Sequence, residues 1–138
     1  MNELQQLNQL MSDSAQDAIG YIKNISNEDI DFNEAGIQQL DSILTGLSQE
    51  HNVNPFDNKM LFTVSTMLGA FIGETFRNRL GGEWFMDKSN PDAPFIVLNY
   101  AGKSYPFASV CFEKIVNDPQ TSVLKYYELA LNNGASSG

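Results

Sequence analysis

Cysteine and histidine are almost missing from this chain, which has one of each among its 138 residues. A lone Cys111 can form neither an intrachain disulfide nor a cysteine metal cluster. A lone His51 excludes a histidine-rich metal site, and no nucleophile elbow is present for it to serve. We therefore expect no catalytic residue, no metal site and no cofactor, in a protein that is not an enzyme. Cys111 is expected in the core, and His51 in an exposed loop.

Basic residues are scarce in the first part of the chain, where residues 1–58 hold ten acids and Lys23 as the one base. Residues 59–138 balance seven acids against seven bases. The net charge of -9 repels phosphate backbones, which makes nucleic acid an unfavourable ligand. It favours a basic protein partner, although the same charge can serve solubility alone. The candidate partner-binding surface consists of four acids of this region: Glu28, Asp29, Glu34 and Asp41.

Long hydrophobic runs are also missing. The most apolar stretch, residues 60–72, contains Thr63, Ser65 and Thr66, and it is too short and too polar to cross a bilayer. Glu3 stands where a signal peptide carries basic residues. We therefore expect no membrane partner and a cytoplasmic protein.

Apolar residues at three- and four-residue steps predict a first helix over residues 3–24. The stripe consists of Leu4, Leu7, Met11, Ala18 and Ile25. It is narrow, and two interpretations remain open. The stripe can be the edge of the core, or a coiled-coil seam that joins two chains into a homodimer.

A polar connector, residues 26–32, leads to a second predicted helix. Asp31, three residues before Glu34, predicts a capping box, in which the aspartate accepts from early helix amides and the glutamate reaches back. The expected inner face is apolar: Ile37, Leu40, Leu44 and Leu47. The residues expected to face water are polar: Gln38, Gln39, Asp41, Ser48 and Gln49.

Apolar side chains fall almost all the way round a third helix, predicted over residues 57–80. A helix of this kind is usually central and buried. Gly81-Gly82 ends it, because glycine readily adopts the left-handed conformation that closes a helix. Gly69 and Gly73 lie four residues apart, which would allow another part of the chain to approach this helix closely.

Three segments with strand patterns follow: residues 83–88, 95–100 and 103–107. The turn signals Asn90-Pro91-Asp92 and Ala101-Gly102 predict an antiparallel meander with residues 95–100 in the middle. This middle strand is apolar at four consecutive residues, 95–98. Either helices cover both faces of the sheet, or one face is a protein contact.

Two more helices are predicted near the C-terminus. The first has an apolar inner stripe: Phe107, Val110, Cys111 and Ile115. Asp118-Pro119, a cap and first-turn pair, predicts a last helix that ends near residue 131, with residues 132–138 as a frayed tail. The expected fold class is α+β, with three N-terminal helices of which the third is central, a three-stranded antiparallel meander and two C-terminal helices. We expect one domain over residues 1–138, in which 1–30 form the first helix and acidic connector, 31–131 the core and 132–138 the tail.

Glu74 is the least expected residue of the third helix, because it interrupts an apolar face and an unpaired buried carboxylate is costly. Arg77 and Asn78, one turn further on, and the indole of Trp84 can donate hydrogen bonds to it. Two interpretations remain open. The cluster can be a structural clasp between this helix and the first strand, or it can form a ligand pocket together with Tyr105. A single carboxylate provides no acid/base pair for catalysis.

Three short motifs carry a family resemblance. They are Leu-Gly-x-x-x-Gly-Glu at residues 68–74, Gly-Gly-x-Trp at 81–84 and Pro-Phe-x-x-Val at 106–110. In this order they resemble a bacterial domain family of unknown function, over residues 31–131. The resemblance implies one α+β domain in which Glu74 and Trp84 belong to a shared feature, and it implies no established activity, cofactor or catalytic residue. This chain has Thr121-Ser122 where the family often has Asp-Ser before its last helix.

Three functions are compatible with these residues. The first is a protein-binding module, of immunity or regulatory type, that presents the acidic helical surface to a partner. The second is a small-ligand or enzymatic domain with a pocket near Glu74 and Trp84. The third is a structural homodimer joined through the first helix.

Overall fold

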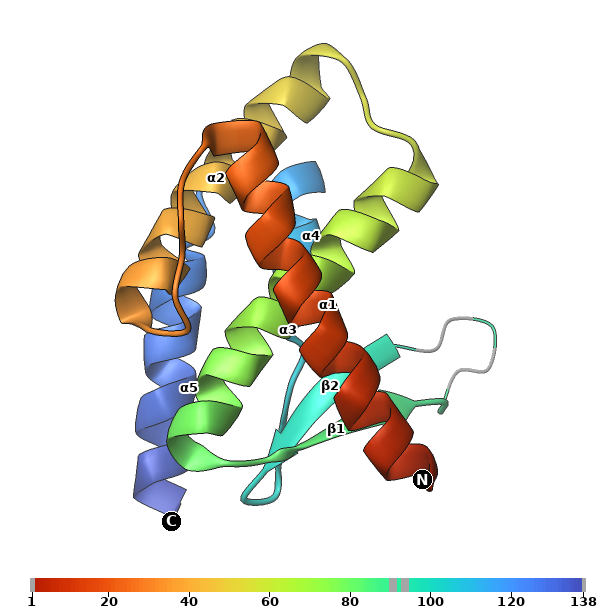
Figure 1. Cartoon of the computed structure of the whole chain (residues 1–138), viewed down its shortest axis with the longest axis vertical. Coiled ribbons are helices and arrows are strands. Elements are labelled where there is room, and N and C mark those ends of the chain that lie inside the picture. The colour runs from red at the N-terminus through yellow and green to blue at the C-terminus, as the bar shows by residue number, and fades with distance from the viewer. Residues whose placement is uncertain (1, 90–91, 93–94, 138) are drawn as a thin grey trace.

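The computed structural model describes residues 2–89, 92 and 95–137 of the chain (Figure 1). These residues form, in order, α1 (Glu3–Ser26), α2 (Glu34–Val53), α3 (Asn58–Leu80), β1 (Glu83–Asp87), β2 (Phe95–Tyr100), β3 (Lys103–Tyr105), α4 (Phe107–Val116) and α5 (Val123–Ser137). The expected α+β class is confirmed, and so is the order of three helices, three strands and two helices among the described residues.

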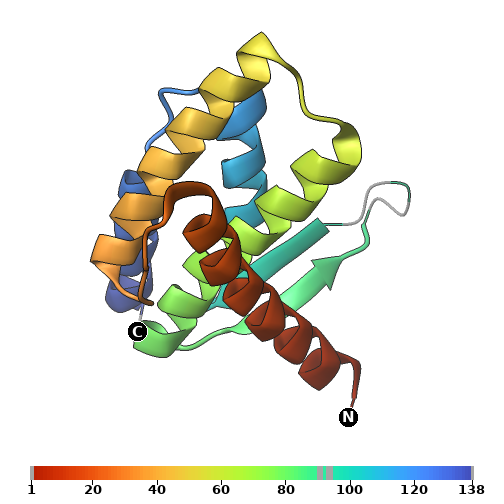
Figure 2. The ribbon, with the colours of Figure 1, turned by 45° about the horizontal axis from the view of Figure 1, so that its top comes forward.

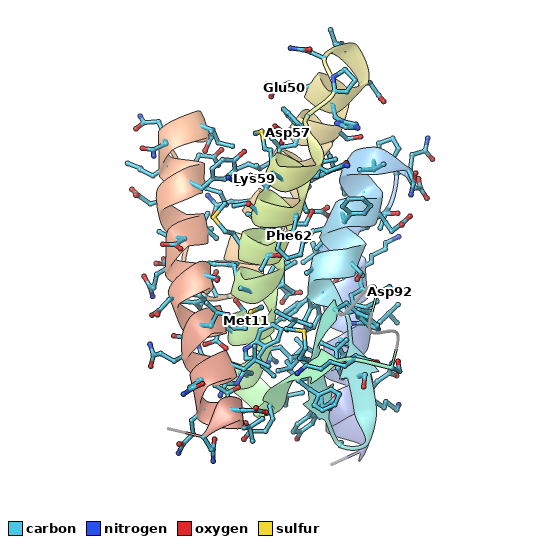
Figure 3. All side chains as sticks on the ribbon, turned by 90° about the vertical axis from the view of Figure 1, so that its right-hand side faces the viewer. Met11, Glu50, Asp57, Lys59, Phe62 and Asp92 are labelled. Carbon is cyan, nitrogen blue, oxygen red and sulfur yellow. The ribbon has the colours of Figure 1, made fainter. Side chains whose placement is uncertain are left out.

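α1 begins with a capping box that the sequence analysis missed. Asn2 Oδ1 accepts from the Gln5 amide at 2.8 Å, and the Gln5 side chain accepts from the Asn2 amide at 3.2 Å. The buried stripe of α1 is Met11, Ala15, Ala18 and Ile22. The two ends of the expected stripe lie outside the core, because Leu4 is 44% and Ile25 50% exposed. The middle of α1 is part of the core, where Met11 lies between α1 and α3 (Figure 3).

α2 starts two residues later than the capping prediction. Its N-cap is Asn33, whose Oδ1 accepts from the Gly36 amide at 2.8 Å. Asp31 lies before the cap, in a turn in which its carbonyl oxygen accepts from the Asn33 amide. The four residues of the expected inner face are all buried, as predicted. Two residues expected to face water do not. Ser48 is 1% exposed, and the Asp41 carboxylate accepts a hydrogen bond from Lys114 of α4.

α3 is the central helix of the fold. Every residue from 68 to 76 is buried, so the prediction of a helix covered all round is confirmed for this part of it. α1 packs on one side of α3 and α4 on the other (Figure 3). A Cβ at Gly69 would overlap the backbone of Ala108 in α4, and a Cβ at Gly73 would overlap the ring of Trp84. The two glycines therefore permit the two close approaches.

The strands form an antiparallel sheet in the order β1-β2-β3, which confirms the meander with β2 in the middle. Trp84, Leu98 and Tyr105 lie side by side across the sheet, on the face that packs against α3. Ala101 and Gly102 both have positive φ, as a tight hairpin turn requires. β3 is two residues shorter than expected, because residue 107 already begins α4. In the predicted turn before β2, residues 90 and 91 lie outside the described residues.

The centre of β2 is covered on both faces of the sheet. Val97 and Leu98 are neighbours in a strand and so point to opposite faces, yet they are 3% and 0% exposed. Leu98 belongs to the hydrophobic core beside α3, whereas Val97 lies outside that core, so both interpretations of the apolar run stay open. The face of Val97 remains open nearby, because Phe85 of β1 and Phe95 of β2 share that face and are 48% and 41% exposed.

The last helix both begins and ends later than predicted. Asp118-Pro119 does not cap it, because the Asp118 carboxylate and carbonyl accept from amides two and three residues further on, in a separate turn. α5 begins at Val123 and continues through residue 137, so a frayed tail is wrong for 132–137, while residue 138 lies outside the described part. The buried Gly134 packs against Leu80 and Tyr100, which holds the late turns of α5 on the body of the fold.

Candidate functional site

Glu74 is the centre of a hydrogen-bonded cluster between α3 and β1. Its Oε2 accepts from Arg77 Nη1 at 2.8 Å and from the indole Nε1 of Trp84 at 3.0 Å. Arg77 Nε also donates to the carbonyl oxygen of Gly82 at 3.1 Å. These bonds join the end of α3, the glycine turn and the first strand. The geometry is that of the structural clasp, with Gly73 leaving room for the indole ring.

Two residues expected in this cluster are not part of it. Asn78 is exposed to solvent. Tyr105 packs its ring against Phe76 and Phe107, at centroid distances of 5.3 and 6.0 Å, and Leu98 separates it from Trp84 across the sheet. Its hydroxyl is buried, without a hydrogen-bond partner among the described residues, and burial raises its pKa. The sequence therefore predicted the pair Glu74 and Trp84 correctly but not a pocket that includes Tyr105.

A shallow polar depression of about 430 Å³ lies beside the clasp. Glu74 and Arg77 border it on one side, and four polar residues of α1 border it on the other: Gln5, Asn8, Gln9 and Ser12. Asn8 fixes α1 to the edge of the sheet, since its Oδ1 accepts from the Trp84 amide at 3.1 Å and its Nδ2 donates to Glu83 Oε2 at 2.7 Å. Asn8 could not be predicted, because an asparagine on the polar face of a helix carries no signal for a partner 76 residues away.

Three of the four acids proposed for partner binding lie on the surface. Glu28, Asp29 and Glu34 are exposed. Asp29 is 3.3 Å from Lys23 Nζ, with 88% of its own side chain exposed. Glu34 lies beside Glu128 of α5, and the pKa of Glu128 is raised, first because its carboxyl group hydrogen-bonds to Glu34. Two carboxylates held this close repel each other unless one is protonated.

Asp41, the fourth of these acids, is not a surface residue, which corrects the prediction. Its Oδ1 is 2.6 Å from Lys114 Nζ of α4, a side chain that is 5% exposed. The Asp41 carboxylate also accepts from the amides of Val123 and Leu124 at 3.2 Å, and so caps the N-terminus of α5. Ser122 adds a hydroxyl at 3.4 Å. Asp41 therefore joins three helices, and its charge is neutralised inside the protein.

An apolar groove of about 1090 Å³ lies between the first turns of α1 and strand β1. Residues 2–10 of α1 and its cap line one wall, and residues 84–89 line the other. Three of the lining side chains are strongly exposed, namely Leu4 at 44%, Leu10 at 55% and Phe85 at 48%. The groove was not predicted, because Leu4 was expected in the apolar stripe of α1.

Within the part of the chain that the structure describes, neither Cys111 nor His51 forms a catalytic arrangement. Cys111 is fully buried, as predicted, and this burial raises the pKa of its thiol far above the ordinary value. His51 is not in a loop but in the last turn of α2, where its Nδ1 accepts from the Phe56 amide at 3.0 Å. Among the described residues, no three metal-ligating side chains come together.

The described helices include none with both the length and the apolar character needed to cross a bilayer. Comparisons of the chain with family models, with curated proteins and with solved structures find no match. The chain is thus defined by its own geometry: an α+β domain with an internally neutralised clasp, an acidic helical surface and an apolar groove beside an edge strand.

Proposed function

We propose that the protein is a protein-binding module, of immunity or regulatory type and acting in the cytoplasm, whose acidic helical surface binds a basic partner protein. One observation carries this proposal. Each of the ten acids among residues 1–58 is exposed, except Asp41. Lys23 is the one base of that region, so most of these charges are uncompensated there. Such a surface attracts a positively charged protein over a distance of about 10 Å at moderate salt.

The acids are most concentrated around the connector between α1 and α2. Glu28, Asp29, Asp31 and Glu34 follow one another within seven residues and are all exposed. The raised pKa of Glu128, which results first from its hydrogen bond to Glu34, adds support, because a Lys or Arg side chain of a partner would relieve the repulsion between these two carboxyl groups. We define the acidic surface as Glu28, Asp29 and Glu34.

The small-ligand alternative has weaker support. Glu74 Oε2 already accepts hydrogen bonds from Arg77 and Trp84, and the depression beside it is shallow. Among the described residues that line this depression there is no second acid and no histidine that could form an acid/base pair with Glu74. We do not propose an enzymatic role, and resemblance to a bacterial domain family adds no activity.

Charge reversal of the acidic surface tests the proposal. The test variant is E28K/D29K/E34K, and the matched control D13K/D17K/E50K makes the same change in net charge with exposed acids elsewhere. Asp41 stays intact in both, because its loss would disturb the fold. Proteins captured from a lysate by the wild-type chain are identified, purified and titrated by calorimetry at two salt concentrations.

The expected partner is basic, and it binds the test variant about tenfold more weakly than the control, since three exposed ion pairs contribute together about 1–2 kcal/mol. Its affinity for the wild-type chain should fall as salt rises. Equal binding to both triple variants, or no purified protein that binds again, would contradict the proposal. Circular dichroism checks that both variants remain folded.

A further inference from the structure

β1 is an edge strand, because the order β1-β2-β3 leaves one of its sides without a neighbouring strand. The Trp84 amide donates to Asn8 Oδ1 of α1, so the main-chain groups of this residue point away from β2. Outward and inward groups alternate along an antiparallel edge strand, which means that the amide and carbonyl of Met86 also point outward. No described residue of the protein forms a hydrogen bond with the Met86 main chain in that direction. Main-chain groups without a partner at a sheet edge are a template for another strand.

The apolar groove lies along this open part of the edge. α1 meets β1 at Asn8 and Trp84, while the first turns of α1 extend beyond the rest of the molecule (Figure 2). The groove is lined by residues 84–89 and, on the side of α1, by the exposed Leu4 and the partly buried Leu7. It therefore offers hydrogen-bonding groups on one wall and apolar contacts on the other. An extended peptide presents both of these kinds of group at once.

We propose that this groove binds an extended, basic segment of a partner protein, which adds to β1 as a further strand. This inference rests on the proposed protein-binding function, and it specifies the form of the bound segment. The charge of the groove indicates that the bound segment is basic. Two acids, Glu3 and Asp87, line the groove, and Lys88 is the one base among its lining residues. Hydrogen bonds from Ser89 lower the pKa of Asp87, so this carboxylate is ionised at neutral pH. Alternate residues of the segment would face Leu4 and Leu7 or lie beside Phe85 and Asp87.

A second copy of the chain fits this groove less well. It would bring another net charge of -9 to the same place. Pairing of two β1 strands about Phe85 would place Glu83 opposite Asp87 twice, and like charges directly opposite each other are destabilising. The Asn8 contact would also limit such pairing to the end of the strand, because it already covers the edge at Trp84.

Selection from a displayed library of random eight-residue peptides tests the inference, with the full chain as the target. The enriched peptides are synthesised and titrated into the isotope-labelled protein. We expect an alternation of apolar and basic residues, the largest amide shifts at Met86 and Lys88, and slower hydrogen exchange of the Met86 amide. Methylation of those peptide amides that point toward β1 should weaken binding about tenfold, whereas methylation of the alternate amides should change it less than about twofold.

Two variants of the protein locate the binding. Leu4→Asp places a charge in the groove without touching the core, and Leu129→Asp on α5 is its matched control, since that leucine is 60% exposed. Met86→Pro removes the outward amide, a change that edge strands tolerate. Leu4→Asp and Met86→Pro should each raise Kd about tenfold, and Leu129→Asp should leave it unchanged.

Several results would overturn the inference. These are equal affinity of the peptides for all three variants, amide shifts away from β1, enrichment of acidic peptides, and a dimer in light scattering that Leu4→Asp dissociates. If basic peptides bind but respond to E28K/D29K/E34K and not to the groove variants, the groove inference fails and the proposed function stands. If neither a basic peptide nor a basic protein binds the wild-type chain, both fail.

Discussion

Glu74, between α3 and β1, and Asp41, between three helices, are withdrawn from water to a similar extent, yet their hydrogen-bond donors differ. Their side chains are 12% and 16% exposed. Glu74 has its donors three and ten residues away in the sequence. The donors of Asp41 lie 73 to 83 residues away, in α4 and at the start of α5. A buried carboxylate with local donors can be recognised from the sequence, whereas one with distant donors cannot be distinguished there from an exposed acid.

The positive partners of these two carboxylates differ as well. The Arg77 side chain is 25% exposed, while the Lys114 side chain is 5% exposed. If its carboxylate is removed, Arg77 can still be hydrated, but Lys114 would remain as a buried ammonium group without a partner. The free energy of unfolding should therefore depend more strongly on Asp41 than on Glu74.

Asp41→Ala should have the largest effect on stability. It leaves Lys114 unpaired and two amides of α5 without an acceptor, so we expect a loss of about 3–5 kcal/mol in the free energy of unfolding. Urea denaturation measures this loss. The Cys111 thiol gives a second readout, because it is buried in the wild-type protein and should react with a thiol reagent faster in the variant.

The matched control for this change is Asp13→Ala, which removes an exposed acid and should alter stability by less than about 0.5 kcal/mol. The double variant D41A/K114M should recover part of the loss, because it removes the unpaired charge. If D41A is as stable as D13A, the expected dependence of stability on the Asp41 carboxylate is wrong.

Gly73→Ala should have the second largest effect, since the new methyl group overlaps the Trp84 ring and pushes the indole away from Glu74. We expect a loss of about 1–3 kcal/mol, as for other overpacked cores. The fluorescence of Trp84, the one tryptophan of the chain, should shift to longer wavelength. Gly46→Ala in α2 is the control: apart from its chain neighbours and the backbone of its own helix, no atom lies within 4 Å of its added Cβ, so it should stabilise by about 1 kcal/mol.

Glu74→Gln should cost less, about 1 kcal/mol. The amide oxygen can still accept from the Trp84 indole, but the bonds lose their charge-assisted part. Urea denaturation followed by tryptophan fluorescence measures the change. A loss as large as that of D41A would mean that Arg77 is not able to reach water, and would remove the difference between the two sites.

Glu128→Gln should have the smallest effect, and its sign depends on pH. The pKa of Glu128 is raised, so the folded state favours the protonated carboxyl group, and the stability that this gives is lost as pH rises through the folded pKa. At pH 7 the variant should melt at a slightly higher temperature than the wild type, because repulsion with Glu34 is gone. Below the ordinary pKa of glutamate the two melting temperatures should coincide. A constant difference between pH 4 and pH 7 would contradict the contact.

The elements of the fold were readable from the sequence because they rest on local periodicity. Apolar residues all round α3 placed it at the centre, and Gly81 marks its end. The strand patterns of residues 83–88, 95–100 and 103–107 and the Ala101-Gly102 turn predicted the meander. The contact between Glu74 and Trp84 could be predicted because Glu74 lies near the C-terminal end of α3 and Trp84 follows that end closely in the sequence.

What could not be predicted depends on contacts between distant segments. Asp41 acquires its partners from two helices that follow the sheet. The start of α5 is set by this carboxylate, so the local cap signal at Asp118 misled the prediction. The exposure of Leu4 arises because α1 extends past the sheet, which its own sequence does not reveal.

The capping of α5 from α2 bears on the order in which the native structure assembles. The first amides of α5 receive their acceptors from a residue 82 and 83 positions earlier, so this helix is incomplete until α2 is in place. A helix of 15 residues is marginal in water by itself. α5 should therefore form late in folding, when it docks onto the earlier helices, and should be the first helix to detach when the protein begins to open.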